Sequence, residues 1–225
     1  GHTFTTKSDT EVLLHGYEQW GVDLLQRVRG MFTFVIWDKN KQELFGARDH
    51  FGIKPFYYAK MNGTFMYASE IKSLLRHPDF VKELNAEALK PYMTFQYPAI
   101  GETFFKGVYK LPEGHYFTYR DGKMDIHRYY DEDFREGKQK LGELVNSIDQ
   151  TVCDSVKAHQ IADVEVGSFL SSGVDSSYVA AVARPQHTYS IGFGKGTYNE
   201  SQQAGELAEL LKLNNTAESL TDEEA

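Results

Sequence analysis

The stretch Phe169-Leu170-Ser171-Ser172-Gly173-Val174-Asp175-Ser176-Ser177 decides the fold of the second half of the chain. It places small and hydroxyl residues between a strand-like apolar run over 164–170 and a helix predicted to begin near Ser176. Such a turn directs free backbone N–H groups and the positive end of the helix dipole at one point. The pattern therefore predicts an anion-binding turn.

The side chains of this turn favour a polyphosphate as the anion. Ser171, Ser176 and Ser177 add hydroxyl donors, and Gly173 permits close approach of a ligand to the backbone. The Asp175 carboxylate suits a magnesium ion that phosphate oxygens would also coordinate. The structural alternative is a plain helix cap, in which Ser172 or Asp175 satisfies the first turn.

Helical and strand-like segments alternate on both sides of the turn. A helical stripe runs from Leu141 to Val156, and a strand-like run over 187–191 precedes a predicted helix over 201–213. This alternation predicts a parallel sheet, of which the chain would hold two strands.

The pattern before residue 131 is different. A helix is expected over 9–25, capped by Ser8 or Asp9, and Asn62-Gly63 predicts a hairpin turn. We expect an antiparallel sheet with strands at 31–37, 44–47, 56–59 and 64–68, a further strand pair at 107–110 and 115–119 around the Asp121-Gly122 turn, and short helices at 69–75 and 85–92.

A polar, charged stretch separates the two patterns. We place a first domain at 1–130, a linker at 131–140 and a second domain at 141–225. The chain opens on Gly1 and closes on Thr221–Ala225, shortly after a predicted helix, so we expect a fragment of a longer protein.

Composition excludes several classes of function. The 24 Lys and Arg against 32 Asp and Glu give a net charge of −8 with no basic run, which argues against nucleic acid as a partner. No apolar run approaches the roughly 20 residues of a membrane span. Cys153 is the single cysteine, so no internal disulfide can form and the cytoplasm is the expected compartment. The eight histidines show no metal-ligand spacing, and no zinc site is expected.

Five segments together resemble one family. The phosphate turn is similar to the Ser-Gly-Gly-x-Asp-Ser pyrophosphatase-type loop of adenylating synthetases, although Ser172 replaces a glycine. The other four, in chain order, are Ser-Asp-Thr-Glu-Val at 8–12, Gly-Ala-Arg-Asp-His-Phe-Gly-Ile-Lys-Pro-Phe-Tyr-Tyr at 46–58, Tyr-Ala-Ser-Glu-Ile-Lys-Ser-Leu at 67–74 and Leu-Pro-Glu-Gly-His at 111–115. The whole chain resembles glutamine-hydrolysing asparagine synthetase.

The resemblance implies a partial α+β glutaminase domain of the N-terminal-nucleophile type, followed by a partial α/β domain like the adenine nucleotide alpha hydrolases. It implies a ligase that makes asparagine from aspartate, with ATP and Mg²⁺ and with glutamine as nitrogen donor. Ammonia released from glutamine would reach a β-aspartyl-adenylate. The implied partners are these small molecules, with neither nucleic acid nor membrane, and a homodimer of the full-length enzyme is consistent with it.

The resemblance also assigns residues. Asp9 matches the acid that binds glutamine, and Asp175 matches the magnesium ligand. The matches to the ATP site are Leu170, Ser171, Ser172, Gly173, Asp175, Ser176 and Ile191. The family's nucleophile is an N-terminal cysteine. The chain begins with Gly1, and Cys153 lies in a predicted helix, so no catalytic residue is expected in it.

Two other readings stay open. A β-lactam synthetase or macrolactam cyclase would share the two-domain plan and the ATP loop, and differ in an acceptor pocket that is expected beyond residue 225. A non-catalytic ATP-binding module would retain the fold of such an enzyme without its activity. A cysteine after the initiator Met upstream of Gly1 would exclude that last reading.

Overall fold

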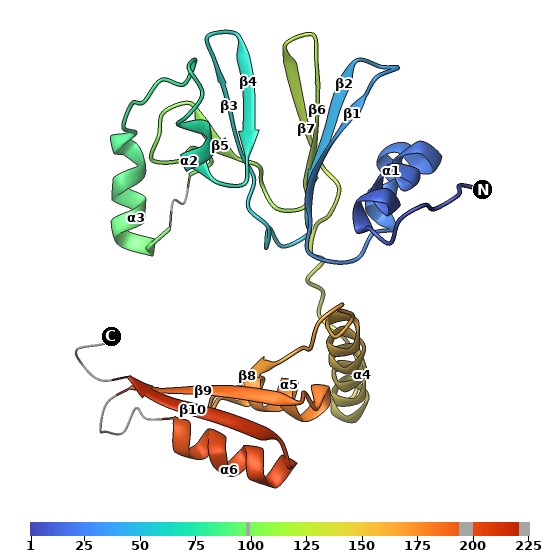
Figure 1. Cartoon of the computed structure of the whole chain (residues 1–225), viewed down its shortest axis with the longest axis vertical. Coiled ribbons are helices and arrows are strands. Elements are labelled where there is room, and N and C mark those ends of the chain that lie inside the picture. Colours follow the sequence, from blue (N-terminus) through green and yellow to red (C-terminus); the bar gives the residue numbers. More distant parts are fainter. Residues whose placement is uncertain (98–99, 194–199, 221–225) are drawn as a thin grey trace. The chain divides into compact units, whose positions relative to one another are not determined.

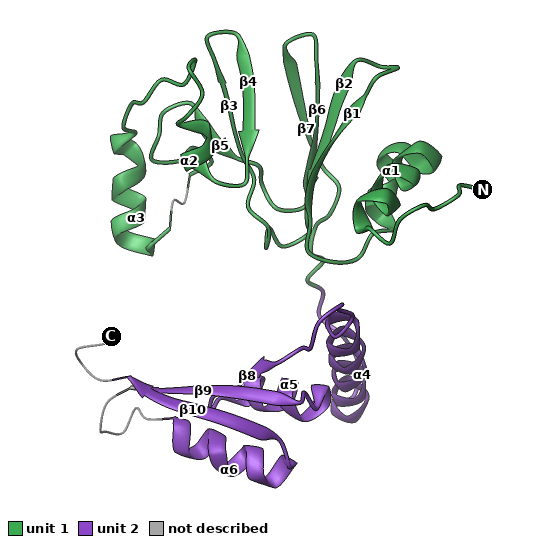
Figure 2. Cartoon of the chain, in the orientation of Figure 1, with its two compact units in different colours: residues 1–134 green, residues 135–225 purple. Residues whose placement is uncertain are grey.

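The computed structural model describes residues 1–97, 100–193 and 200–220 (Figure 1). The chain forms two compact units, residues 1–134 and 135–225 (Figure 2). Within the described ranges, every helix is too short or too polar to span a bilayer.

Unit 1 contains two antiparallel sheets. One has the strand order β1-β2-β6-β7 and the other β4-β3-β5. Asn62 and Gly63 join β3 to β4 with positive φ angles of 50° and 83°, as expected for a tight hairpin turn. The strands are β1 (Thr33–Asp38), β2 (Glu43–Arg48), β3 (Tyr57–Met61), β4 (Thr64–Ala68), β5 (Val108–Lys110), β6 (His115–Arg120) and β7 (Lys123–Arg128).

Helices of unit 1 pack against the faces of these sheets: Tyr17 and Leu25 share a core with one sheet, and Ile71 and Leu74 share a core with the other (Figure 1). Helix α1 (Asp9–Trp20) begins after Ser8, whose Oγ accepts a hydrogen bond of 3.2 Å from the Thr10 N–H. The predicted helix over 9–25 ends early because Gly21 takes a positive φ of 57°, and the chain continues as the 3₁₀ helix η1 (Gly21–Gln26). The remaining short helices are α2 (Ile71–Leu74), η2 (Ala86–Ala88) and α3 (Leu89–Phe95).

The predicted pairing of 107–110 with 115–119 is wrong. β5 pairs with β3 in one sheet, whereas β6 pairs with β2 and β7 in the other. The reason is Leu111, which is fully buried with Phe56 and Phe117 and carries the chain from one sheet to the other. The turn at Asp121-Gly122 instead joins β6 to β7, a strand that the sequence analysis missed.

Unit 2 holds one parallel sheet with the order β10-β9-β8, and the predicted parallel sheet is thereby confirmed. Its elements are α4 (Leu141–His159), β8 (Ser168–Phe169), α5 (Val174–Ala183), β9 (His187–Phe193), α6 (Ser201–Leu211) and β10 (Asn214–Leu220). The expectation of two strands is wrong, because β10 adds a third. That strand is polar and mostly exposed at the sheet edge, so it lacks the apolar pattern that identifies strands in sequence.

The core of unit 2 lies on one side of its sheet. Leu170 packs there with Ala180 of α5 and with Ala204 and Ala208 of α6. The opposite face exposes large apolar side chains at Phe169, Tyr189 and Ile191. The polar turn that contains Ser171 and Ser176 follows directly after the end of β8.

Candidate functional site

The turn between β8 and α5 is organised by its own hydroxyls. The Oγ atoms of Ser171 and Ser176 lie 2.8 Å apart. The Ser171 N–H donates to Ser176 Oγ at 3.2 Å, and the Gly173 N–H donates to Ser171 Oγ at 3.2 Å. The two serines thus link the strand end to the first turn of the helix and fix the path of the backbone between them.

The N-terminus of α5 is open. Gly173 is its N-cap residue, with extended backbone angles, and among the described residues none caps this helix with a side chain. The plain cap by Ser172 or Asp175 is therefore wrong; both residues are exposed. The first N–H groups of an α-helix have no partner within the helix, so those at the start of α5 are left for a ligand.

The two apolar residues assigned to the ATP site differ in what they can offer. Leu170 is 2% exposed and its side chain belongs to the core, while its N–H donates to the Tyr189 carbonyl at 2.8 Å. Ile191 is 49% exposed on the other face of the sheet. A ligand at the strand ends could touch the Ile191 side chain and only the backbone of Leu170.

Ser190 positions this turn and was missed by the sequence analysis. It is buried, and its Oγ donates to the Leu170 carbonyl at 2.8 Å and lies 3.1 Å from Asn215 Oδ1. Its signal in the sequence is an alternation along β9, in which the hydroxyl residues Thr188 and Ser190 are buried and the residues between and beside them are exposed. The hydroxyl ties the turn to the central strand.

In unit 1, Asp9 lies at the start of α1 beside a cleft of about 300 Å³. The hydroxyls of Ser8 and Thr10 are each 3.5 Å from Asp9 Oδ1, at the long limit for a hydrogen bond, so the exposed carboxylate stays open to a ligand. The cleft is lined by Asp9, Thr10, Leu13, Met31, Phe32, Thr33, Phe34, Lys54, Pro55 and Ser69.

Two further polar groups of this cleft were not assigned from the sequence. Lys54 is exposed and supplies a positive charge in the same cleft as the negative charge of Asp9. The hydroxyl oxygen of Thr33 is buried and has no hydrogen-bond partner among the described residues. An acid, a base and an unsatisfied hydroxyl around one cleft suit a small zwitterion.

The charged residues after β2 serve the fold. Arg48 is 2% exposed and donates to the carbonyls of Lys54 at 2.7 Å, Leu111 at 2.6 Å and Gly52 at 2.5 Å. Asp49 is 1% exposed and accepts from the N–H groups of Phe51, Ile53 and Lys54 at 2.9 to 3.2 Å. Both side chains satisfy backbone groups around this turn, which is a structural role.

Comparison with known proteins gives two matches to family models. The glutamine amidotransferase domain matches residues 1–130, and asparagine synthase matches residues 147–225. Curated relatives include the glutamine-hydrolyzing asparagine synthetases 1 and 3 of Bacillus subtilis, 40% identical over 100% of the chain and 35% identical over 86%. A putative glutamine-hydrolyzing asparagine synthetase of Mycobacterium bovis is 36% identical over 100%.

The chain spans about a third of the length of these relatives: 36%, 33% and 36% respectively. The amidotransferase match covers more than half of the chain, and the asparagine synthase match follows it in the same order as the two units. The chain belongs to the family of glutamine-hydrolysing asparagine synthetases.

Proposed function

We propose that this chain is part of a ligase that makes asparagine from aspartate, with glutamine as nitrogen donor and ATP as energy source. Residues 1–130 would form a glutaminase domain of the N-terminal-nucleophile type, 131–140 a linker, and 141–225 an ATP-binding domain like the adenine nucleotide alpha hydrolases. The antiparallel sheets of unit 1 and the parallel sheet of unit 2 support these assignments. The single cysteine supports a cytoplasmic setting, and a homodimer is consistent with the family.

The open turn after β8 carries this proposal. Its uncapped helix N-terminus and the hydroxyls of Ser171 and Ser176 form a donor set that suits the pyrophosphate of ATP. Asp175, exposed in the first turn of α5, would hold Mg²⁺. Ser172, Gly173, Ile191 and the backbone of Leu170 would complete the contacts to the nucleotide. ATP bound there would supply the activation of the aspartate carboxyl group.

The cleft at α1 supports the glutamine half of the proposal. Asp9 would bind the α-amino group of glutamine, and Lys54 lies in the same cleft, where it would pair with the α-carboxylate. The buried Thr33 hydroxyl would gain a partner in the bound substrate. These residues would bind and orient glutamine, and none of them would take part in its hydrolysis.

Titration calorimetry of the chain with Mg-ATP tests the proposal. We expect binding, and we expect Asp175→Ala to weaken it by about tenfold or more, since each 1.4 kcal/mol of lost interaction costs a factor of ten. Glu209→Ala is the matched control, because it removes an exposed acid of the same unit on α6, away from the turn. Equal affinities for Asp175→Ala and the unchanged chain would contradict the assignment of the metal ligand.

A further inference from the structure

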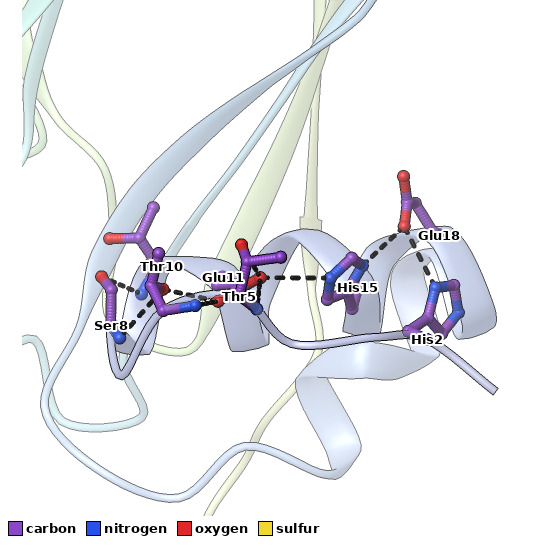
Figure 3. Close-up of polar contacts among 8 residues, drawn as sticks. His2, Thr5, Ser8, Thr10, Glu11, His15 and Glu18 are labelled. Carbon is purple, nitrogen blue, oxygen red and sulfur yellow. Dashed lines mark hydrogen bonds and ion pairs between the residues drawn. The ribbon is translucent and has the colours of Figure 1, made fainter.

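The segment before α1 is fastened along this helix by side chains (Figure 3). Nearer the helix start, both Glu11 oxygens accept hydrogen bonds from the N–H and hydroxyl groups of Thr5 and Thr6, at 2.5 to 3.0 Å. Farther along the helix, His2 lies beside His15 and Glu18. The segment and the helix thus meet at two polar clusters.

The second cluster joins two imidazoles to one carboxylate. Glu18 Oε2 lies 2.9 Å from His15 Nδ1 and 3.3 Å from His2 Nδ1. The two rings stack with centroids 4.7 Å apart and an interplanar angle of 27°. Among the described residues, these three form the one group of His, Cys, Asp and Glu that could hold a metal ion, with ligand atoms within 4.8 Å of one another.

We propose that His2, His15 and Glu18 form a binding site for a divalent transition metal of the zinc type. Metal bonds of about 2.0–2.2 Å in a tetrahedron place ligand atoms about 3.3 Å apart. The two separations from Glu18 already lie near this value. Nitrogen and carboxylate donors in a two-to-one ratio suit zinc, and the fourth position would hold water because the cluster is open to solvent.

The surroundings favour a metal at this place. Glu11 Oε1 lies 3.6 Å from His15 Nε2, the ring nitrogen that would not bind the metal. Carboxylates in this position orient ligand histidines in many metal sites. Metal binding would require His2, which lies on the segment outside the helix, to turn out of its stack on His15. Because histidine binds a metal in its neutral form, the affinity of the site should fall at low pH.

This proposal departs from the expectation drawn from histidine spacing. His15 and Glu18 are one helical turn apart on α1, and His2 approaches from the preceding segment. A search for His-Glu-x-x-His misses such a set because one ligand is supplied by tertiary structure.

Titration of the tag-free chain with ZnCl₂, followed by calorimetry, tests the site. We expect one zinc ion per chain, and a loss of affinity of about 10-fold or more in His15→Ala and in Glu18→Gln. Glu18→Gln preserves size at a mostly exposed side chain, so it guards against loss of folding. His127→Ala, on β7 outside the cluster, is the matched control and should bind as the unchanged chain does.

Cobalt provides an independent readout. Co²⁺ bound by these residues should give visible absorption bands of four-coordination that are absent in His15→Ala. Zinc binding that survives both His15→Ala and Glu18→Gln, as chelation by the first residues of the chain would, overturns the proposal. The absence of zinc binding to the unchanged chain overturns it as well.

Discussion

Two turns of the molecule are built from similar polar residues and do opposite things. In the turn after β2, Arg48 and Asp49 are buried, and their hydrogen bonds go to backbone groups of the same unit. In the turn after β8, Asp175 is exposed and the serine hydroxyls bind only within the turn, in front of an uncapped helix. The polar groups of the first turn are satisfied by the fold, whereas the second turn leaves Asp175 and the helix N-terminus exposed.

The difference shows why a long, specific motif need not be an active site. The run from Arg48 to Pro55 is the most specific string of the sequence, and its two buried charges, Arg48 and Asp49, maintain the shape of a turn that borders the cleft beside Asp9. The shorter turn at 171–177 has a less specific composition and carries the proposed chemistry. Burial separates the two, because a buried charge must be satisfied by the protein itself.

Replacement of the two aspartates should separate the turns most widely. Asp49→Ala leaves the N–H groups of Phe51, Ile53 and Lys54 without their acceptor and removes the negative charge beside the buried Arg48, so it should lower the free energy of unfolding by about 3–5 kcal/mol. Asp175→Ala should lower it by less than about 1 kcal/mol, the size of a helix-dipole contribution. Urea unfolding followed by tryptophan fluorescence measures the first change, because Trp20 and Trp37, the two tryptophans, lie in unit 1.

Circular dichroism is needed for Asp175→Ala, because unit 2 has no tryptophan. Asp49→Asn serves as a graded control, since it keeps one acceptor oxygen and presents an amide donor where Lys54 N–H now donates. Its loss should fall between that of Asp49→Ala and none. Equal losses for Asp49→Ala and Asp175→Ala would remove the distinction between the turns.

The glycines of the two turns give a second, smaller contrast. Gly52 has a φ of +63°, and a Cβ there would lie 2.9 Å from the Arg48 guanidinium, so Gly52→Ala should cost about 1–3 kcal/mol. Gly173 has a φ of −70°, and its Cβ would meet Ser171 Oγ at 3.3 Å. Gly173→Ala should change stability by under about 0.5 kcal/mol. It should weaken Mg-ATP binding, because the methyl group stands at the mouth of the turn.

The same two methods, urea unfolding and calorimetry, measure both glycine variants. Gly63→Ala is a useful reference, since Gly63 also has a positive φ but a Cβ there would meet nothing within 4 Å. Gly63→Ala therefore measures the cost of a positive φ without the cost of a steric contact such as that with Arg48. A Gly52→Ala loss no larger than that of Gly63→Ala would mean that Arg48 moves aside without cost.

The start of α1, unlike the uncapped start of α5, should make the stability of the fold depend on pH. Hydrogen bonds from Thr6 and Thr5 lower the pKa of Glu11, in the first turn of α1, from 4.5 to about 2. A lowered carboxyl pKa stabilises the fold above the unfolded value, and this contribution is lost as the pH falls from about 4.5 to about 2. Nuclear magnetic resonance should show the Glu11 carboxyl titrating near pH 2, with faster exchange of the Thr5 and Thr6 amides below it. A titration midpoint near pH 4.5 would mean that the hydrogen bonds from Thr5 and Thr6 to Glu11 do not form in solution.

Much of the fold could be predicted from local patterns. The run over 64–68 became β4 with the same bounds, and the alternation after residue 140 indicated a parallel sheet. The partner of β5 could not be predicted, because the burial of Leu111 between two sheets depends on contacts far apart in sequence. β10 could not be predicted either, since its strand pairing is made by the backbone and its side chains are mostly polar.

The candidate sites were predictable where the residues adjoin in sequence. The hydroxyls of 171–176 lie on one turn, so local reading was sufficient to propose them together. Lys54, Thr33 and Asp9 come from three separate segments, and only the folded chain brings them to one cleft. His2 and His15 were dismissed for the same reason, because spacing along the chain does not measure distance across it.

The crossing at Leu111 has a consequence for how unit 1 forms during synthesis. β5 completes one sheet, and β6 and β7 complete the other, with pairings as distant as Tyr57 with Lys110 and Leu44 with Tyr119. The first sheet cannot close until the ribosome has released the chain past Lys110, and the second cannot close until it has released the chain past Arg128, so the hairpins made earlier must wait with their edges open. Pairings this distant in sequence also slow folding. The nascent chain of unit 1 should therefore depend on chaperones until β5, β6 and β7 have emerged and both sheets have closed.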